Sequence, residues 1–324
     1  MNNMATYKIG IIGGAGYTAG ELIRLLVNHP AAEIAFVHSD SHAGEAVAMV
    51  HEGLWGETDL HFVAEAALDQ VDVLFLCGAH GKSAQFWEGR QKPEGLKVID
   101  LAQDYRDQSE GYVYGLPEWQ KDRIRKADKL ANPGCFATAI QLALLPLAAK
   151  GLLTSAVDVT AITGSTGAGV KPSASTHFSW RNNNISAYKV FEHQHLLEIR
   201  RNLGSLQGQA PSINFVPLRG DFARGIFASL HTPCALSQEE VEALYNEFYK
   251  DAPFTFLFPG SVDLKQVVNT NKCLIGVEKH GDELVITSVI DNLLKGAVGQ
   301  AVQNMNLMLG LDETLGLKLK ASAF

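Results

Sequence analysis

Cys135 is the residue of this sequence whose type and position most strongly favour covalent chemistry. It follows Asn132-Pro133-Gly134, which predicts a tight turn, and a helical apolar pattern begins directly after it at Phe136. The positive end of a helix dipole lowers the pKa of a thiol and favours the nucleophilic thiolate. We therefore predict a reactive thiol at the start of this helix, with a buried structural cysteine as the alternative.

The other three cysteines do not indicate chemistry. Cys77, Cys234 and Cys273 lie in or beside strand-like segments, with no C-x-x-C pair and no histidine cluster at ligand spacing. That spacing argues against a structural zinc site and against a disulfide framework. We expect no metal, and we interpret these thiols as small buried side chains.

A nucleophilic cysteine needs a base and a group that orients the base. The segment FEHQHLLEIRRNL supplies His193 and His195, and Glu198 follows three residues after His195. If a helix begins near His195, the carboxylate lies one turn on, close enough to orient an imidazole. Two histidines at a helix start are equally compatible with a solvated surface, and their spacing does not decide which one is the acid/base.

A second set of residues predicts a nucleotide site. In KIGIIGGAGYTAGELIRLL, a glycine-rich turn stands between a strand pattern and a helix pattern. Glycines permit a tight turn and let backbone N–H groups approach a phosphate at the helix start. A turn without a ligand is the alternative. The candidate cofactor-binding residues of this turn are Gly13, Gly14, Ala15, Gly16, Tyr17 and Thr18.

The end of the next strand bears on the choice of cofactor. An acidic residue about 20 positions beyond the turn holds the ribose hydroxyls of NAD, whereas NADP needs neutral or basic surroundings there. Here Ser39 and the neighbouring histidines His38 and His42 suit a 2′-phosphate, while Asp40 would repel one if it pointed inward. The residues themselves leave NADP and NAD both open.

These residues require two kinds of domain to position them. Residues 1–150 alternate short apolar strand patterns with helices, which predicts an α/β, Rossmann-type doubly wound domain with a parallel sheet. Residues 151–292 are richer in strands, with one helix after the cap-like Ser237, and predict an α+β domain with a mostly antiparallel sheet. The segment LLKGAVGQAVQNMNLMLG predicts an amphipathic helix near the C-terminus.

Composition excludes several function classes. A chain of 324 residues with 46% hydrophobic and 19% charged residues predicts a soluble globular protein of about two domains. The net charge of −8 with no basic block argues against nucleic acid or an anionic membrane surface as a partner. We see no export signal and no apolar run long enough for a membrane span, and therefore expect a cytoplasmic location.

Together, a nucleotide turn, a helix-start cysteine and downstream histidines indicate redox chemistry on an aldehyde or acyl phosphate. The chain resembles the N-acetyl-gamma-glutamyl-phosphate reductase family of arginine biosynthesis, which is related to aspartate-semialdehyde dehydrogenase. The most specific segments are ANPGCFAT and DNLLKGAVGQAVQNMN, and further matching segments are GIIGGAGYTAGELIRLL, HEGLWG, DLAQDYR, YGLPE, ITGSTGAGVKP, EHQHLLEIRRNL and ARGIF.

The resemblance implies a thioester mechanism. The thiolate of Cys135 would attack the small-molecule acyl phosphate and expel inorganic phosphate, and NADPH would reduce the resulting thioester to the semialdehyde. His195 is favoured as the acid/base, with His193 close to the substrate. The family also implies a homodimer or homotetramer, and a C-terminal segment, residues 293–324, that packs back on the nucleotide domain.

Further site residues follow from the resemblance alone. Arg106 and Arg224 would hold the substrate phosphate or carboxylate. Asn292, with Lys295 and Gly296 nearby, would approach the nicotinamide. Ser165, Thr166 and Gly167 would lie beside the thiol and the nicotinamide, and Ser165 and Glu198 are the further candidates for contact with the substrate.

Some residues depart from the family pattern. Ala19-Gly20 replaces the usual order of glycine then alanine, and Asp40 stands where an arginine or a small residue is common, so NADP over NAD rests on the family. Extra cations at Lys171, Arg181 and Arg219 would suit the additional carboxylate of an N-succinyl substrate.

Three other functions remain as alternatives. Aspartate-semialdehyde dehydrogenase is opposed by the His-x-His cluster and by DNLLKGA. A nucleotide-binding regulator without chemistry is opposed by the intact Cys135, His193 and His195, and a cysteine hydrolase of acyl groups by the glycine turn.

Overall fold

The computed structural model describes residues 5–322, which divide into two units. Within the described residues, the first unit contains the chain up to Pro133 together with Ala297–Lys318, and the second contains Gly134–Gly296 and the residues after Lys318. The division therefore lies between Pro133 and Gly134 and not near residue 150, because the helix that begins at Cys135 packs on elements of the second unit.

The first unit is built on a parallel sheet, as the short apolar strands predicted. All six of its strand pairings are parallel, and β4 and the last four residues of β1 are buried because both faces of such a sheet are covered. The strands in sheet order are β3 (Phe62–Val63), β2 (Ala32–His38), β1 (Tyr7–Ile12), β4 (Val73–Leu76), β5 (Lys97–Asp100), β7 (Lys129–Ala131) and β6 (Val113–Tyr114).

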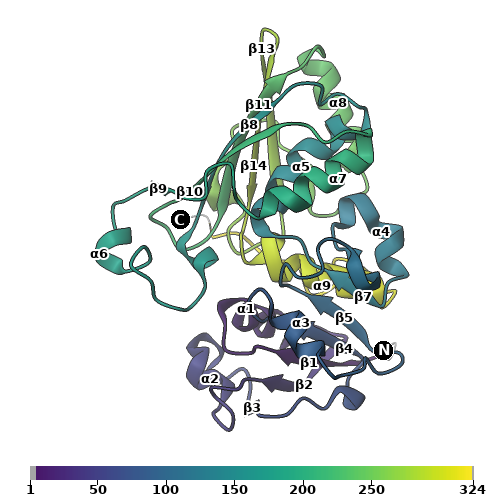
Figure 1. Ribbon diagram of the computed structural model, residues 1–324, viewed down its shortest axis with the longest axis vertical. Coiled ribbons are helices and arrows are strands. Elements are labelled where there is room, and N and C mark those ends of the chain that lie inside the picture. Colours follow the sequence, from purple (N-terminus) through teal and green to yellow (C-terminus); the bar gives the residue numbers. More distant parts are fainter. Residues whose placement is uncertain (1–4, 323–324) are drawn as a thin grey trace. The chain divides into compact units, whose positions relative to one another are not determined.

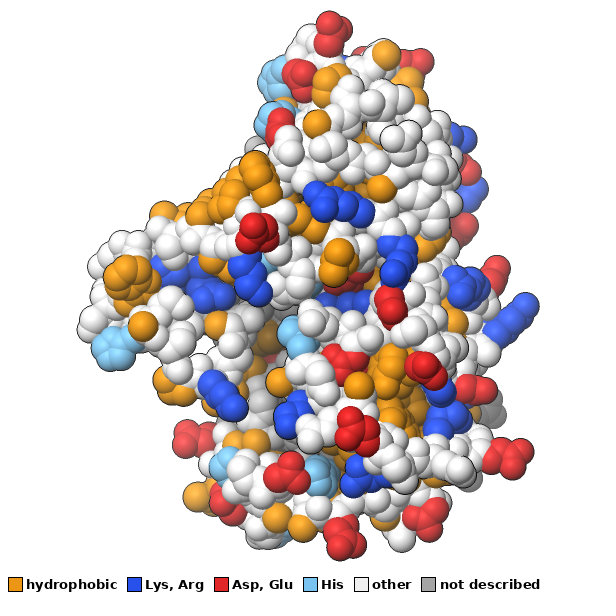
Figure 2. All heavy atoms as spheres, viewed as in Figure 1, with side chains coloured by type: hydrophobic (Ala, Val, Ile, Leu, Met, Phe, Trp, Pro, Cys, Tyr) orange, Lys and Arg blue, Asp and Glu red, His pale blue; other side chains and the backbone are white. Residues whose placement is uncertain are grey.

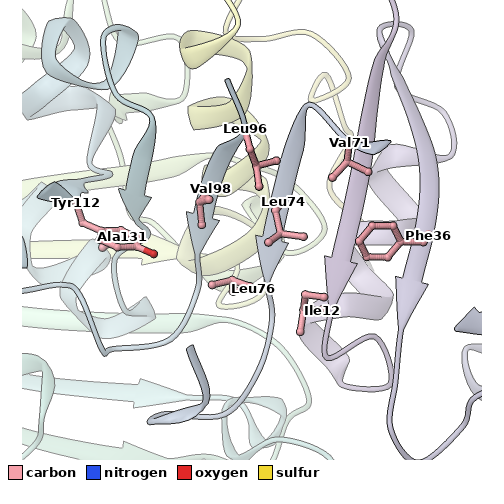
Figure 3. Packing of buried hydrophobic residues seen from close by; sticks show 9 residues of the cluster. All are labelled: Ile12, Phe36, Val71, Leu74, Leu76, Leu96, Val98, Tyr112 and Ala131. Carbon is pink, nitrogen blue, oxygen red and sulfur yellow. The ribbon is translucent and has the colours of Figure 1, made fainter. Parts of the chain in front are cut away.

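Apolar side chains from five of these strands form one buried cluster, which includes Ile12, Phe36, Leu74 and Val98 (Figure 3). Phe86 and Trp87 pack against it from α3. The helices of this unit are α1 (Tyr17–Leu26), α2 (Val47–Val50), α3 (Lys82–Trp87), α4 (Pro117–Arg125) and α9 (Gly299–Met308). Short 3-10 helices span Glu52–Leu54, Leu68–Gln70 and Ser109–Gly111.

The second unit contains a mixed sheet in which four of six pairings are antiparallel, as expected. Alternate residues of β8 are buried, because helices cover one face of the sheet. The strands in sheet order are β12 (Thr255–Leu257), β13 (Cys273–His280), β14 (Glu283–Ile290), β11 (Ile226–Pro233), β8 (Val157–Thr163), β10 (Ile213–Arg219) and β9 (Ser186–Ala187).

Three helices of the second unit pack on this sheet and on one another: α5 (Cys135–Ala149), α7 (His195–Gln207) and α8 (Gln238–Tyr249) (Figure 1). The expected cap of α8 is present, since Ser237 and Glu240 form a capping box. A fourth helix, α6 (Phe178–Arg181), lies in the long connection between β8 and α7, and 3-10 helices span Ser165–Ala168 and Leu264–Gln266.

The C-terminal helix differs from the sequence prediction. A π-helical turn, Leu294–Val298, precedes α9, and every residue of α9 is buried, so the helix is not amphipathic at a surface. Its polar side chains are hydrogen bonded inside the first unit. Asn304 donates to the carbonyl oxygen of Gly115, and Asn306 pairs with the imidazole of His29 at 3.1 Å. The expected segment ended at residue 324, and its last two residues lie outside the described part of the chain.

Two further findings concern function classes. Among residues 5–322, none of the helices is long and apolar enough to cross a membrane, and no group of three or more His, Cys, Asp and Glu side chains is placed to hold a metal ion. Figure 2 shows Lys and Arg side chains interspersed with Asp and Glu on the visible face, which agrees with the absence of a basic block in the sequence.

Candidate functional site

The thiol of Cys135 lies on the first residue of α5, where the sequence placed it. Gly134 is the N-cap, with an extended backbone, and its carbonyl oxygen accepts the N–H of Thr138 at 2.8 Å. The helix that follows is mostly apolar and is buried from Phe136 to Ala148. The half-buried thiol is therefore held by a rigid element, at the end where the N–H groups of the helix lack intrahelical acceptors.

Glu198, in the first turn of α7, holds the backbone beside this thiol. Its Oε2 accepts the N–H of Gly134 at 3.2 Å, and the side chain is only 5% exposed. A buried charge-assisted hydrogen bond of this kind fixes the turn that carries Cys135. Glu198 was expected beside a histidine or the substrate, and the structure places it on the turn before Cys135.

His193 and His195 lie together against the residue that follows the thiol. Their ring centroids are 4.5 Å apart, and both rings meet the ring of Phe136 edge-on, at 5.4 Å for His193 and 6.3 Å for His195. Both imidazoles are buried, so they are not solvated surface residues. Because Phe136 is the neighbour of Cys135, the fold brings the histidine pair to the start of α5.

One hydrogen bond determines which ring nitrogen of His193 carries the proton. The backbone N–H of His195 donates to its Nδ1 at 3.2 Å, so Nδ1 is an acceptor and the proton of the neutral ring is on Nε2. Burial, and to a smaller extent the charge of Lys189, lower the pKa of His193 to about 4. His193 is therefore neutral at physiological pH, and its Nδ1 binds the backbone N–H of His195, the first residue of α7.

Tyr188 is a residue of this cluster that the sequence argument missed. Its ring lies 5.7 Å from that of His193, and the guanidinium of Arg219 stacks on it at 4.8 Å. Burial raises the pKa of Tyr188, and the proximity of Cys135 raises it further, so the phenol keeps its proton. An isolated aromatic residue in ISAYKV gave no signal, because its relevance comes from the folded position alone.

The glycine segment after β8 is held by a neighbouring loop. Ser165 and Thr166 donate their backbone N–H groups to the carbonyl oxygens of Phe222 and Ala223. A Cβ at Gly164 would lie 2.4 Å from the oxygen of Ala223, so the approach of the two backbones requires glycine here. Gly167, further along the segment, is exposed.

Asn292 joins these loops to the C-terminal end of β14. Its Oδ1 accepts the N–H of Gly225 at 2.7 Å, and its Nδ2 donates to Oγ1 of Thr166 at 3.0 Å. Close by in sequence, a Cβ on Gly296 would lie 2.9 Å from Cβ of Cys135. The segment after β14 thus lies directly against the thiol residue, and the amide of Asn292 ties together the loops beside it.

Arg224 forms an ion pair within the protein. Its Nε and a terminal nitrogen bind the two carboxylate oxygens of Asp291 at 3.1 and 3.2 Å, and Asp291 has no exposed surface. The same carboxylate accepts the N–H groups of Asn269, Leu293 and Leu294. Arg224 was expected at the substrate, and Asp291, which the sequence argument missed, takes up one edge of its guanidinium.

The extra cations are used differently from one another. Arg181 is buried and donates to the carbonyl oxygen of Arg219 at 3.0 Å and to Oγ of Ser186 at 3.2 Å, so these two nitrogens hold the connection in shape. Lys171 is exposed, and Arg219 stacks on Tyr188.

In the first unit, the glycine turn has the shape of a phosphate cradle. Gly13 has φ +77°, and a Cβ there would lie 3.0 Å from the backbone of Gly78. Gly16 is the N-cap of α1, and a Cβ there would have one heavy atom within 4.0 Å, so its side of the turn is open. The residues present therefore fit a dinucleotide, with the diphosphate at the start of α1.

The side chains at the end of β2 lie in different surroundings. Ser39 is buried, and its hydroxyl is 3.4 Å from that of Ser41. The carboxylate of Asp40 is 97% exposed and lies 3.5 Å from Nε2 of His38. The carboxylate is therefore exposed to solvent and lies beside an imidazole.

Arg106 belongs to the first unit, where it braces the chain that leads toward the cysteine. Its Nε donates to the carbonyl oxygen of Asn132 at 2.9 Å, and a terminal nitrogen donates to that of Leu101 at 3.1 Å. In the same motif, Asp104 accepts N–H groups at the start of α3, and burial raises the pKa of Asp100 to about 6. The motif DLAQDYR is therefore held largely by its own unit.

Comparison with known proteins decides the family. Two family models match, the semialdehyde dehydrogenase NAD binding domain over residues 8–127 and the semialdehyde dehydrogenase dimerisation domain over residues 135–292. The N-acetyl-gamma-glutamyl-phosphate reductase of Bacteroides thetaiotaomicron is 59% identical over 320 residues, which cover 98% of this chain and 99% of the relative. The chain belongs to the N-acetyl-gamma-glutamyl-phosphate reductase family.

Other members and solved structures agree. The family member from Flavobacterium johnsoniae is 54% identical over 324 residues, covering 98% of this chain and 99% of that one. Aspartate semialdehyde dehydrogenase II of Vibrio cholerae has a TM-score of 0.76 at 17% identity and covers 94% of this chain and 99% of that chain. The aspartate semialdehyde dehydrogenase of Candida albicans, solved with NADP, has a TM-score of 0.70 at 15% identity and covers 94% of this chain and 99% of that chain. These two share the fold, and the sequence prediction of fold and family is confirmed.

Membership makes this chain an oxidoreductase whose first unit holds a nicotinamide cofactor. The second unit matches the dimerisation domain, which indicates an oligomer. Within that unit, the structure brings together Cys135, His193, His195 and Glu198 through the contacts described above.

Proposed function

We propose that this protein reduces N-acetyl-gamma-glutamyl phosphate to N-acetyl-glutamate 5-semialdehyde and inorganic phosphate with NADPH, a step of arginine biosynthesis. The observation that carries the proposal is the cluster at the start of α5, where Cys135 follows a turn held by Glu198 and both histidines lie against Phe136. The choice of substrate is supported by the high identity to relatives named N-acetyl-gamma-glutamyl-phosphate reductase.

Cys135 begins the reaction. The N-terminal end of α5 favours the thiolate, which attacks the acyl carbon, and the bond from that carbon to the phosphate oxygen breaks. The products of this step are a thioester on Cys135 and inorganic phosphate. The nicotinamide cofactor, when bound, supplies the hydride that reduces the thioester. The resulting hemithioacetal releases the aldehyde and restores the thiol.

His195 is the acid/base in this proposal. It takes the proton of the thiol and later moves a proton at the hemithioacetal oxygen. His193 is the neutral partner that holds the backbone of His195 through Nδ1. Tyr188 keeps its proton and offers a hydrogen-bond donor near Cys135.

The substrate's anionic groups need cations. We assign Arg106 and Arg224 to them, because a guanidinium binds phosphate and carboxylate groups bidentately. We assign Ser165 to the substrate, with Gly167 and Asn292 beside the nicotinamide.

NADP is preferred over NAD in this proposal. Ser39 and His38 offer hydrogen-bond donors at the end of β2, and the charge of Asp40 is solvated. Replacing Asp40 by alanine should change kcat/KM for NADPH by less than about threefold. The choice of NADP would be overturned if the unaltered protein preferred NADH and Asp40→Ala gave a large increase in kcat/KM for NADPH.

The acyl group is N-acetyl in this proposal, because two terminal nitrogens of Arg181 bind backbone and hydroxyl oxygens within the protein. Steady-state kinetics with N-acetyl- and N-succinyl-gamma-glutamyl phosphate test it. A higher kcat/KM for the succinyl compound would contradict the assignment.

A homodimer or homotetramer in the cytoplasm completes the proposal. Exposed apolar side chains at Phe178, Trp180, Ile185 and Phe191, on the connection between β8 and α7, support association. Light scattering after size-exclusion chromatography should give two or four times 35.1 kDa, and a monomer at micromolar concentration would contradict it.

The assay of function runs in the reverse direction. N-acetyl-glutamate 5-semialdehyde should reduce NADP⁺ only when phosphate is present, and aspartate semialdehyde should not. Cys135→Ser should lose the activity, whereas the matched control Cys234→Ser should keep it. Full activity of the Cys135 variant would refute the thioester, and turnover of aspartate semialdehyde alone would refute the substrate.

A further inference from the structure

The imidazole of His51 lies against the glycine turn of the first unit. Its Nε2 is 2.7 Å from the carbonyl oxygen of Gly14. Because a carbonyl oxygen can only accept, Nε2 carries a proton, and the hydrogen bond persists whether or not Nδ1 is protonated. His51 follows α2 directly, in the segment HEGLWG, which has no role in the proposed reaction.

This hydrogen bond sets the direction of the peptide between Gly14 and Ala15. The N–H of Gly14 donates to the carbonyl oxygen of His38 at 2.8 Å, so Gly14 is held on both sides. In a trans peptide the C=O of one residue and the N–H of the next point in opposite directions. Since the oxygen of Gly14 is directed at His51, the N–H of Ala15 is directed away from it.

The two sides of the turn differ in packing. A Cβ at Gly14 would lie 2.3 Å from Cγ1 of Val37, whereas a Cβ at Gly16 would have one heavy atom within 4.0 Å. The open side adjoins the first turn of α1, whose N–H groups have no intrahelical acceptor and attract phosphate. An N–H of Ala15 aimed away from His51 adds one donor to that set.

Gly20 provides the space that the imidazole occupies. A Cβ at Gly20 would lie 2.6 Å from Nδ1 and 2.8 Å from Cε1 of His51. The ring is anchored to Gly14 through Nε2, so a methyl group at position 20 could be accommodated only by moving the ring off that anchor. This contact gives a physical reason for the order Ala19-Gly20 in this chain.

We propose that His51 is a positioning residue of the cofactor site. It holds the carbonyl of Gly14 so that the N–H of Ala15 faces the diphosphate of the dinucleotide, and Gly20 leaves room for its ring. The inference rests on the proposed function only in requiring that a nicotinamide dinucleotide bind at this turn.

Equilibrium binding of NADPH and NADH to the full chain, measured by calorimetry, tests the proposal beside steady-state kinetics. For His51→Ala we expect Kd and KM for the dinucleotide to rise about tenfold, which corresponds to about 1.4 kcal/mol, with kcat at saturating cofactor unchanged. His51→Gln, whose amide also donates, should recover part of the affinity. His61→Ala, the change of an exposed histidine in the same unit, should bind as the unaltered protein does.

A double variant separates this role from a general loss of packing. Gly20→Ala should raise Kd as His51→Ala does, and the two changes together should raise it no further, because they disable the same contact. Folded variants whose Kd stays within about twofold of the unaltered value would overturn the inference, even if Tm falls. If His51→Ala does not fold, Gly20→Ala and His51→Gln decide in the same way.

The test also distinguishes the two levels of proposal. If the unaltered protein binds neither dinucleotide, the proposed cofactor fails and this inference fails with it. If the unaltered protein binds a dinucleotide and the variants bind equally well, only the role of His51 is refuted.

Discussion

The backbone beside Cys135 is held by a residue far along the chain. Glu198 lies 64 positions beyond Gly134, yet its carboxylate accepts the N–H of Gly134. The nucleophile and the histidines therefore lie at or just before the starts of two helices, α5 and α7, that pack on each other. A site built on rigid helices keeps its reacting groups at fixed separations.

Changes at Glu198 should separate hydrogen bonding from charge. Glu198→Ala leaves the buried N–H of Gly134 without its acceptor, so we expect the free energy of unfolding to fall by about 1–3 kcal/mol and kcat to fall with it. Glu198→Gln keeps an oxygen acceptor and should retain most of the stability. Denaturant unfolding and kcat measure both effects, and equal losses in the two variants would contradict an acceptor role.

His193 should make the stability of the protein depend on pH. Its folded-state pKa of about 4 lies below the ordinary 6.5, so the unfolded chain binds this proton more readily. Protonation of the unfolded chain therefore lowers the free energy of unfolding. This loss is absent above pH 6.5 and grows as the pH falls from 6.5 to 4, to at most about 3 kcal/mol.

A matched variant isolates the contribution of His193 to this pH dependence. Asparagine at position 193 can still accept the N–H of His195 but does not titrate, so His193→Asn should lose less stability between pH 6.5 and 4 than the unaltered protein. Urea unfolding at each pH gives the comparison. Parallel pH profiles would show that His193 is not the group involved.

At the scale of elements, the segment that follows β14 closes around the cysteine residue. A Cβ on Gly296 would lie 2.9 Å from that of Cys135, closer than real Cβ atoms approach one another. Gly296→Ala should displace the thiol and lower kcat by at least about tenfold, since small misplacements of reacting groups are costly. Gly53→Ala, where a Cβ meets nothing within 4 Å, is the control. Unchanged kcat in Gly296→Ala would contradict this packing.

The same segment depends on a buried ion pair. Asp291 is fully buried and neutralised by Arg224, so Arg224→Met would leave an uncompensated charge and should lower the free energy of unfolding by about 3–5 kcal/mol. Arg224→Met/Asp291→Asn should recover part of that loss. A single variant as stable as the unaltered protein would mean that the pair contributes little.

Some elements were predictable from local sequence, and others were not. The strand, glycine turn and helix at residues 7–26 were predictable because turn chemistry and apolar periodicity are local signals. The burial of α9 was not, because its polar residues resemble an exposed face until Gly115 and His29 supply partners. Tyr188 and Asp291 were missed for the same reason, since their partners lie elsewhere in the chain.

At the scale of the whole molecule, each unit contains one part of the proposed machinery. The first holds the glycine turn, and the second holds Cys135 with its histidines. The chain returns to the first unit at Ala297, one residue after the glycine that faces Cys135. The sequence predicted two domains but placed their boundary near residue 150, because α5 resembles a crossover helix of the first sheet.

The covalent step on Cys135 is the central claim, and intact-protein mass spectrometry tests it most directly. Mixing the protein with N-acetyl-gamma-glutamyl phosphate in the absence of cofactor should release one inorganic phosphate per chain and add the mass of one N-acetyl-glutamyl group. Peptide mapping should locate that group on Cys135, and Cys135→Ser should show neither change. Phosphate release without an adduct, or an adduct on another residue, would contradict the account.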